Sequence, residues 1–381
     1  MNIMMISADV SVTAGDKGPF YYMLEEFHRH FDRIDVIGLR PAQRLHDRIF
    51  GNVFLHHPRR GKLFQPFFIR RTGTRLMRER DYAFAVSHDY NLFYNGLGAY
   101  LLHRKSGLPY ISEIHHVPGH PRAANLREVV DRICTRFYVR WVQKHALAIR
   151  VVNAREQPGL LTGWGVRPDK IKVLYSLYMD FDTYHPQPAP KEYDLMFCGR
   201  LVGNKGLFII LDALEILKRE RPDARLLVVG RGPLEHALDR RIRRSGLSAH
   251  VHRIAWVADT KALAELYRRS RILVCASYNE GGPRVTAEAM ACGTPALSTP
   301  VGIMPDLIRE GENGFLFQWD PSELASKAKA LLTDPALYER VRGNLADTVA
   351  PFERKKVLAD LAEGFKALVK GGSRPLLPFP N

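Results

Sequence analysis

Residues 271–302 read RILVCASYNEGGPRVTAEAMACGTPALSTPVG and carry a clear structural pattern. An apolar run is followed by a glycine-containing turn, and Pro283 then suits the first turn of a helix. Gly293 is typical of a helix end, and a second apolar run begins just after it. We therefore expect strands at 271–276 and 296–299 around a helix at 284–291. Apolar strands joined by a helix indicate a parallel sheet and an α/β domain.

The same alternation extends in both directions along the chain. In the second half it predicts strands at 195–199, 225–230 and 250–255, and helices at 206–219, 233–245, 260–269 and 322–333. In the first half it predicts strands at 2–8, 33–39, 83–88, 109–115 and 147–153, and helices at 19–31, 95–106 and 126–145. The sequence thus predicts two doubly wound, Rossmann-like α/β domains with a cleft between them.

The expected domain boundaries follow from where this pattern lapses. A segment with three prolines indicates a linker at 178–194, between an N-terminal domain at 1–177 and a C-terminal domain at 195–352. Residues 353–381 are expected to form a C-terminal helix and tail that pack back toward the N-terminal domain, with an irregular end in GGSRPLLPFPN.

The composition limits the classes of partner and compartment. The 381 residues include 56 Lys and Arg against 40 Asp and Glu, a net charge of +16, so anionic partners are expected. No apolar run approaches the roughly 18 residues of a membrane span, and the start MNIMMISADV lacks the pattern of a signal peptide. The four cysteines have neither metal-binding nor redox spacing, which suits buried thiols in a reducing cytoplasm.

Two glutamates stand where a ligand could meet the predicted turn and helix. Glu280 lies in the turn and Glu288 in the helix behind it, while Gly281 and Gly282 would let a ligand approach the backbone. A carboxylate in the loop can accept hydrogen bonds from sugar hydroxyls, and one on the helix can hold a ribose diol. Spacing alone leaves open an ordinary strand–helix corner with two solvated glutamates.

Segments of the second half resemble a known family. Two glutamates with seven residues between them, inside EGGPRVTAEAMACGTP, are similar to the signature of the retaining glycosyltransferases of family 4, within the glycosyl transferases group 1. FCGRLVGNKG (197–206), LLVVGRGP (226–233) and VGIMPDLIREGENGFLF (301–317) resemble further segments of that family in the same order. The resemblance implies the GT-B fold, in which two Rossmann-like domains face each other across a nucleotide-sugar cleft.

The resemblance also implies roles for individual residues. Arg200 and Lys205 would hold the donor diphosphate, with Gly230 in the next glycine turn, while Glu280 orients the donor sugar and Glu288 holds the ribose. The chemistry of the side chains agrees, because two cations in one loop can stabilise a leaving diphosphate without a metal ion. Without the family context, a solvated basic loop is the alternative for these two residues.

The first half is expected to bind the acceptor. Gly15 and Gly18 follow the first strand and resemble the family's glycine loop near the donor phosphate, although a plain strand-to-helix turn fits equally well. His115, in ISEIHHVPGH, aligns with the family's histidine near the donor sugar, where a neutral imidazole could assist the acceptor. His116 is the competing register, and either residue could be an ordinary loop histidine.

Three features depart from the family pattern. Relatives often carry Asn-Gly-Val-Asp before the linker, whereas this chain reads YSLYMD at 175–180. Arg284 stands where an aliphatic residue is common, and it could reach an anionic group on the donor or point to solvent. The Asp180-Phe181-Asp182 triplet matches a metal-binding pattern of another transferase fold, but its place in the linker indicates a coincidence.

The positive charge is concentrated in the first half. Residues 40–80 hold eleven Lys and Arg against two acids, interleaved with phenylalanines. The predicted helix at 126–145 carries Arg132, Arg136, Arg140 and Lys144 opposite Val129, Ile133, Phe137 and Trp141. Basic and aromatic side chains together favour docking on an anionic membrane, with a solvated helix face as the alternative. Nucleic-acid binding is not expected, because no helix-turn-helix, finger or RNP-like spacing is present.

These observations predict a cytoplasmic hexosyltransferase, peripherally attached to the inner face of the plasma membrane. It would move a hexosyl group from a UDP- or GDP-sugar to a glycan or lipid-linked acceptor, in polysaccharide or lipopolysaccharide synthesis, with neither metal nor cofactor. Two alternatives remain: a glucan phosphorylase-like enzyme of the same fold, and a non-catalytic scaffold or binding protein.

Overall fold

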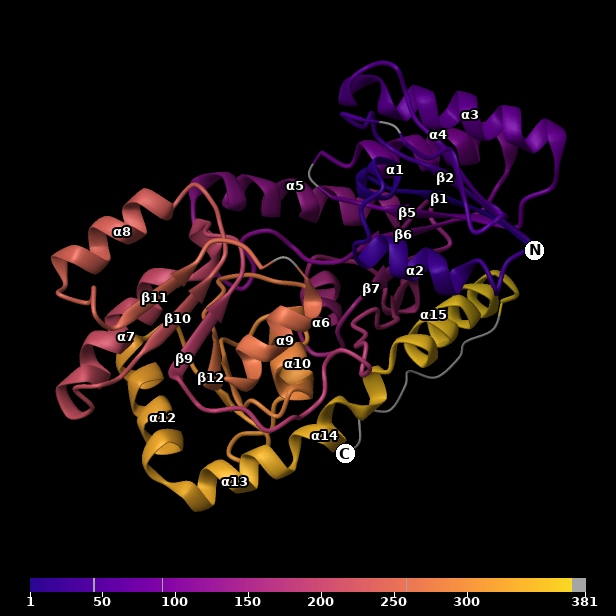
Figure 1. The fold of residues 1–381 in the computed structure, drawn as a ribbon. Coiled ribbons are helices and arrows are strands. Elements are labelled where there is room, and N and C mark those ends of the chain that lie inside the picture. Colours follow the sequence, from indigo (N-terminus) through magenta and orange to yellow (C-terminus); the bar gives the residue numbers. More distant parts are fainter. Residues whose placement is uncertain (44, 91, 258, 372–381) are drawn as a thin grey trace. The chain divides into compact units, whose positions relative to one another are not determined.

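The protein is described here by a computed structural model that covers residues 1–371, except 44, 91 and 258 (Figure 1). The predicted irregular tail and Arg44, one of the eleven basic residues at 40–80, lie outside these described residues. The chain forms two units: Met1–Val117, Val130–Ser176 and the segment from Lys355 on make the first, and Pro118–Val129 with Leu177–Arg354 make the second. Each unit is an α/β fold, so the predicted class is confirmed; the expected cleft stays a prediction.

The first unit is built on an eight-stranded sheet in the order β3-β4-β2-β1-β5-β6-β7-β8, parallel except for β3. Its strands are β1 Asn2–Ile6, β2 Arg33–Ile37, β3 Arg48–Ile49, β4 Val53–His56, β5 Phe84–His88, β6 Tyr110–Ile114, β7 Ala148–Val151 and β8 Ile171–Val173. Its helices are α1 Ser11–Ala14, α2 Pro19–Phe27, η1 Lys62–Phe64, α3 Gln65–Glu79, α4 Tyr94–Ser106, α5 Leu126–Val142, α6 Gln157–Gly163, η2 Pro168–Lys170 and α15 Arg354–Val369. Strand order reverses between β1 and β5, which makes this the switch point of a doubly wound sheet.

Helices cover both faces of this sheet. Buried residues of α3, α4, α5 and α6 share one apolar cluster with alternate residues of the strands. On the other side, Phe27 of α2 and Phe84 of β5 both pack against Phe365 of α15, with ring centroids 6.2 and 6.3 Å apart. The C-terminal helix thus completes the core of the first unit.

The second unit contains a six-stranded, fully parallel sheet in the order β11-β10-β9-β12-β13-β14. Its strands are β9 Tyr193–Cys198, β10 Leu226–Val229, β11 Val251–Ile254, β12 Ser270–Cys275, β13 Ala296–Ser298 and β14 Phe315–Leu316. Its helices are η3 Gly203–Lys205, α7 Leu207–Glu220, α8 Glu235–Arg244, α9 Thr260–Arg268, α10 Arg284–Ala291, α11 Met304–Leu307, α12 Pro321–Thr333, α13 Pro335–Gly343, α14 Leu345–Val349 and η4 Ala350–Phe352. The apolar faces of α7, α8 and α12 pack with the strands in one core cluster. Here the switch point lies between β9 and β12.

The structure differs from the sequence prediction in several places. Residues 118–129 cluster with the second unit, whereas the sequence placed them inside a continuous N-terminal domain. Strands β3, β4, β8 and β14, the longer helices α3 and α13, and the short helices α1, α6, α11 and α14 were not predicted. Among the described residues, no helix combines the length and apolar character needed to cross a membrane. Cys275 and Cys292 are buried, and Cys134 and Cys198 are partly exposed.

Candidate donor site

The second unit presents its candidate site at the switch point of its sheet. The loop after β9 contains Arg200 and Lys205, and the loop after β12 contains Glu280. Because β9 and β12 are neighbouring parallel strands, both loops leave the same edge of the sheet. Ligands of doubly wound domains bind at this edge, where the strand order reverses.

Lys205 and Glu280 meet directly across these loops. The Lys205 ammonium donates to the Glu280 carboxylate, and both side chains are about one-fifth exposed. The buried Ser277 hydroxyl donates to the same carboxylate at 3.0 Å. A cation and a carboxylate are therefore held side by side at the edge where a ligand would arrive.

Glycine allows the loops to approach each other this closely. Gly206 has φ +62°, and a Cβ there would lie 1.9 Å from the Ala276 carbonyl oxygen. Gly230, at the end of β10, has φ +144°, and its Cβ would lie 1.9 Å from the Gly199 carbonyl oxygen. Both glycines are thus required by the packing of the loops, and this requirement is independent of any ligand.

Glu288 lies on α10 in a different environment from that of Glu280. Its carboxylate accepts a hydrogen bond from the Tyr267 hydroxyl at 3.0 Å and lies 3.8 Å from the Arg284 guanidinium. Burial raises the pKa of Glu288, and these two neighbours oppose the rise only in part. The side chain is one-tenth exposed, so one edge of it remains open to solvent.

The other predicted donor residues lie along the same edge. Arg200 directly follows Gly199, and its side chain is exposed. Gly281 and Gly282 are partly exposed in the turn between Glu280 and α10. The second unit therefore brings together, at one sheet edge, all the donor residues that the sequence predicted in the second half of the chain.

Sequence reasoning missed a segment of the first half that packs onto these loops. Asn279 is buried, and its side-chain amide donates to the Arg122 carbonyl at 3.0 Å and to the Glu128 carboxylate at 2.9 Å. The Arg122 guanidinium lies over the ring of Tyr278, 4.9 Å from its centroid, and 5.7 Å from that of Trp319. These contacts explain why residues 118–129 cluster with the second unit. Since the partners lie some 150 residues apart, only a structure could reveal them.

In the first unit, His115 directly follows β6 and is half exposed. Its Nε2 lies 3.6 Å from the Glu113 carboxylate and 3.5 Å from the Arg150 guanidinium. Burial alone would raise the pKa of Glu113, but Arg150 and His88 hold it well below its usual value. Burial lowers the pKa of His115, and the charges of Arg150 and His88 lower it further, whereas Glu113 opposes the shift.

The remaining residues of the first half have simpler surroundings. Gly15 has φ +88° and ends the short helix α1, and Gly18 immediately precedes Pro19, the first residue of α2. The predicted glycine loop is therefore an exposed strand-to-helix connection that includes one helical turn. His116 is exposed beside His115.

Two departures from the family pattern find structural explanations. The Arg284 guanidinium contacts Tyr178: it donates to the Tyr178 carbonyl at 3.2 Å and lies over the Tyr178 ring. The Asp180 carboxylate accepts from the Asp182 backbone N–H at 3.3 Å and from the Thr183 hydroxyl at 3.1 Å, which caps a turn. Within the part of the chain that is described, no group of three His, Cys, Asp or Glu side chains is arranged to hold a metal ion.

Residues 180–346, nearly the whole second unit, match the family model described as glycosyl transferases group 1. Over these residues the chain is similar to that family. It also resembles the D-inositol 3-phosphate glycosyltransferase of Streptomyces scabiei, with 30% identity over 219 residues, 52% of this chain and 46% of the relative. The chain spans about half the length of the curated relatives that it matches first.

Two solved structures resemble this chain over nearly its whole length. HepE from Anabaena, solved in complex with UDP and glucose, has a TM-score of 0.74 at 18% identity and covers 96% of this chain and 99% of its own. The sucrose-phosphate synthase of Thermosynechococcus elongatus has a TM-score of 0.79 at 16% identity, covering 97% and 100%. This likeness establishes the GT-B fold and confirms that prediction.

Proposed function

We propose that the protein transfers a hexosyl group from a nucleotide-diphosphate sugar to a glycan or lipid-linked acceptor, with retention of configuration as in family 4. The Lys205–Glu280 pair at the switch point carries the proposal. It places a cation suited to a diphosphate beside a carboxylate suited to sugar hydroxyls.

The proposed chemistry rests on charge stabilisation. As the glycosidic bond breaks, the diphosphate gains about one negative charge, which Lys205 and Arg200 would stabilise from fixed positions. Glu280 is engaged by Lys205 and Ser277, so we assign it to orienting the donor sugar and not to covalent attack. The acceptor hydroxyl then attacks from the face that the diphosphate leaves, and a departing phosphate oxygen takes its proton.

The other site residues complete this assignment. Glu288 would hold the ribose diol through its exposed edge, and Gly230, Gly281 and Gly282 would let the nucleotide approach the backbone. His115 would act on the acceptor side, where an imidazole without a second proton can accept a hydrogen bond. Gly15 and Gly18 lie after β1, beside the switch point of the first unit, and would contact the acceptor or the donor phosphate.

The names of relatives support the donor and acceptor classes. HepE binds UDP and glucose, and the Streptomyces relative is named for a phosphorylated acceptor. We propose a UDP- or GDP-sugar donor without metal, and a role in cell-surface polysaccharide or lipopolysaccharide synthesis. The protein would act in the cytoplasm, peripherally on the inner face of the plasma membrane, where lipid-linked acceptors are found.

Calorimetric titration with UDP and GDP, in the presence of a chelator, tests the donor site. We expect one nucleotide to bind, and Lys205→Ala and Arg200→Ala each to weaken binding roughly tenfold or more, because charge-assisted hydrogen bonds are lost. Arg219→Ala, which removes an exposed charge from the far end of α7, should leave affinity unchanged. Absence of binding by the wild type would contradict the proposal.

Transfer itself needs a separate variant. Glu280→Gln should retain nucleotide affinity within a few-fold, while turnover of the matching sugar nucleotide falls about 100-fold or more. The anomeric configuration of the product, read by NMR, tests retention. Nucleotide binding without turnover by the wild type would instead indicate the non-catalytic binding protein.

A further inference from the structure

Helix α5 exposes an apolar stripe. Val130, Ile133 and Phe137, all in the first unit, are 51%, 50% and 66% exposed, and their spacing places them on one helix face. The helix buries its opposite face, which consists of Thr135, Tyr138, Val139 and Val142. A helix that buries one face in a core rarely leaves a second apolar stripe in water unless something covers it.

Basic residues border and prolong this stripe. Arg136 lies beside it and is exposed, while Arg140 and Lys144 continue the same face one and two turns further on. The sequence predicted basic residues opposite Ile133 and Phe137. In the structure, the apolar and basic side chains instead share the exposed side of the helix.

A second apolar group begins helix α3. Leu63, Phe64 and Phe67 are 72%, 48% and 58% exposed. Exposed basic residues surround them in the sequence, namely Arg59, Arg60, Lys62, Arg70 and Arg71. Between Asp47 and Glu79 the sequence contains no acidic residue. This segment therefore has the same combination of apolar and cationic side chains as the α5 stripe.

Both groups belong to one helical layer. Helix α4 packs against α3, with Leu102 at Gly73, and its Tyr100 contacts Trp141 of α5, with ring centroids 4.8 Å apart. The three helices follow the parallel strands β4, β5 and β6, so their first turns lie at the same edge of the sheet. The α3 group and the α5 stripe thus belong to one helical layer of the first unit.

We propose that these two groups form a docking surface for an anionic phospholipid bilayer, into which Phe64, Phe67, Ile133 and Phe137 insert. The inference deepens the proposed function and rests on it, since it names the surface that would bring the enzyme to a lipid-linked acceptor. Aliphatic and aromatic side chains gain free energy at the level of the acyl chains, while the neighbouring arginines and lysines meet anionic headgroups. A nucleic acid would match the charge but not the aliphatic stripe.

Vesicle sedimentation tests the surface on the full-length protein. Wild type should bind phosphatidylcholine vesicles that contain phosphatidylglycerol, bind pure phosphatidylcholine at least tenfold more weakly, and lose binding as salt is raised. The pair Ile133→Ser with Phe137→Ser, and the pair Phe64→Ser with Phe67→Ser, should each lower the partition coefficient about tenfold or more. Arg136→Glu with Arg140→Glu should do the same.

Matched controls separate the surface from general charge and hydrophobicity. Leu147→Ser removes an exposed apolar side chain just before β7, outside α5, and Arg243→Glu with Arg244→Glu makes an equal charge change on α8; neither should reduce vesicle binding. The inference would be overturned if wild type failed to bind anionic vesicles, or if the control variants lost as much vesicle binding as the surface variants. It would also be overturned if the surface bound a protein partner in place of vesicles. Nucleotide titration of every variant keeps this result distinct from a failure of the proposed transferase function.

Discussion

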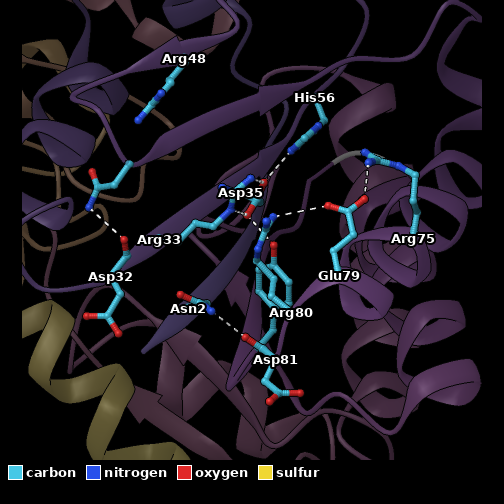
Figure 2. A network of polar contacts seen from close by, with 12 residues as sticks. Asn2, Asp32, Arg33, Asp35, Arg48, His56, Arg75, Glu79, Arg80 and Asp81 are labelled. Carbon is cyan, nitrogen blue, oxygen red and sulfur yellow. Dashed lines mark hydrogen bonds and ion pairs between the residues drawn. The ribbon is translucent and has the colours of Figure 1, made fainter.

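At the scale of single residues, Asp35 in the first unit shows how strongly a buried carboxylate depends on its partners. It is fully buried in β2 and accepts hydrogen bonds from Arg33 at 2.6 Å, His56 at 2.7 Å and Tyr82 at 2.5 Å (Figure 2). Burial raises the pKa of Asp35, but the hydrogen bonds from its three partners outweigh burial and lower the pKa to about 2. The ionised form is therefore part of the folded state.

The pKa of Asp35 predicts a defined pH dependence of stability. Because the folded-state pKa lies below the ordinary 3.8, the contribution of Asp35 is complete above about pH 4 and is lost as pH falls toward 2. The shift corresponds to about 2 kcal/mol. We expect Asp35→Asn to lower the free energy of unfolding at pH 7 by about 3 kcal/mol, because Arg33 loses its buried counter-charge. The difference from wild type should shrink between pH 4 and 2.

Urea unfolding across this pH range measures the effect, and Asp32→Asn is the matched control. Asp32 precedes the same strand, but its side chain is 80% exposed (Figure 2). Its removal should change stability by less than about 1 kcal/mol. An Asp35→Asn difference that persists unchanged at pH 2 would show that folding does not lower the pKa of Asp35.

At the scale of elements, the loop between β9 and α7 depends on the absence of one side chain. Gly206 and Gly246 have nearly the same φ, +62° and +63°, but a Cβ meets a backbone oxygen at Gly206 and nothing within 4 Å at Gly246. We expect Gly246→Ala to cost about 1 kcal/mol from backbone strain alone. Gly206→Ala should cost about 3 kcal/mol or more, since the two loops must also separate.

Nucleotide affinity gives this comparison a second readout. Lys205 immediately precedes Gly206, so moving the loop displaces the cation that we assign to the diphosphate. Gly206→Ala should therefore weaken UDP or GDP binding more than tenfold at a temperature where it remains folded, whereas Gly246→Ala should not. Equal effects of both substitutions would mean that the close approach to Ala276 is unimportant.

Elements also show what the sequence could and could not predict. The predicted ends of apolar strands such as β1, β9 and β12 lie within two residues of the ends in the structure. These strands are easy to recognise because both faces of a parallel sheet are buried, which makes the strands continuously apolar. Helix α3 was missed because its buried face relies on Thr72 and Gly73 beside only two aliphatic residues, Ile69 and Leu76, and its exposed face is strongly basic. The spacing of Glu280 and Glu288 pointed to the site, but the pairing with Lys205 requires two loops 75 residues apart.

At the scale of the whole molecule, the chain passes between its two units more often than a single linker would require. Residues 118–129 leave the first unit for the second and then return, and the chain returns once more at Lys355 after the second unit is complete. Neither unit is therefore a continuous stretch of sequence. Local patterns, which the sequence analysis relied on, carry no signal for such exchanges, because the contacts that fix them join distant residues.

The last of these exchanges leads to a prediction about stability and binding together. Phe365 is 1% exposed and packs between Phe27 and Phe84 in the first unit, far in sequence from both. Phe365→Ala should lower the free energy of unfolding by about 3–5 kcal/mol, because it leaves a cavity in that core. Phe67→Ala, the same truncation at a 58% exposed position, should change it by less than about 0.5 kcal/mol. Below the melting temperature, Phe365→Ala should leave nucleotide affinity unchanged, because Arg200, Lys205 and Glu288 belong to the second unit. Thermal unfolding followed by circular dichroism measures the stability, and calorimetric titration on the same samples measures the affinity. A stability equal to that of wild type would mean that α15 does not complete the core of the first unit in solution. A loss of nucleotide affinity together with the loss of stability would mean that nucleotide binding by the second unit depends on the core of the first.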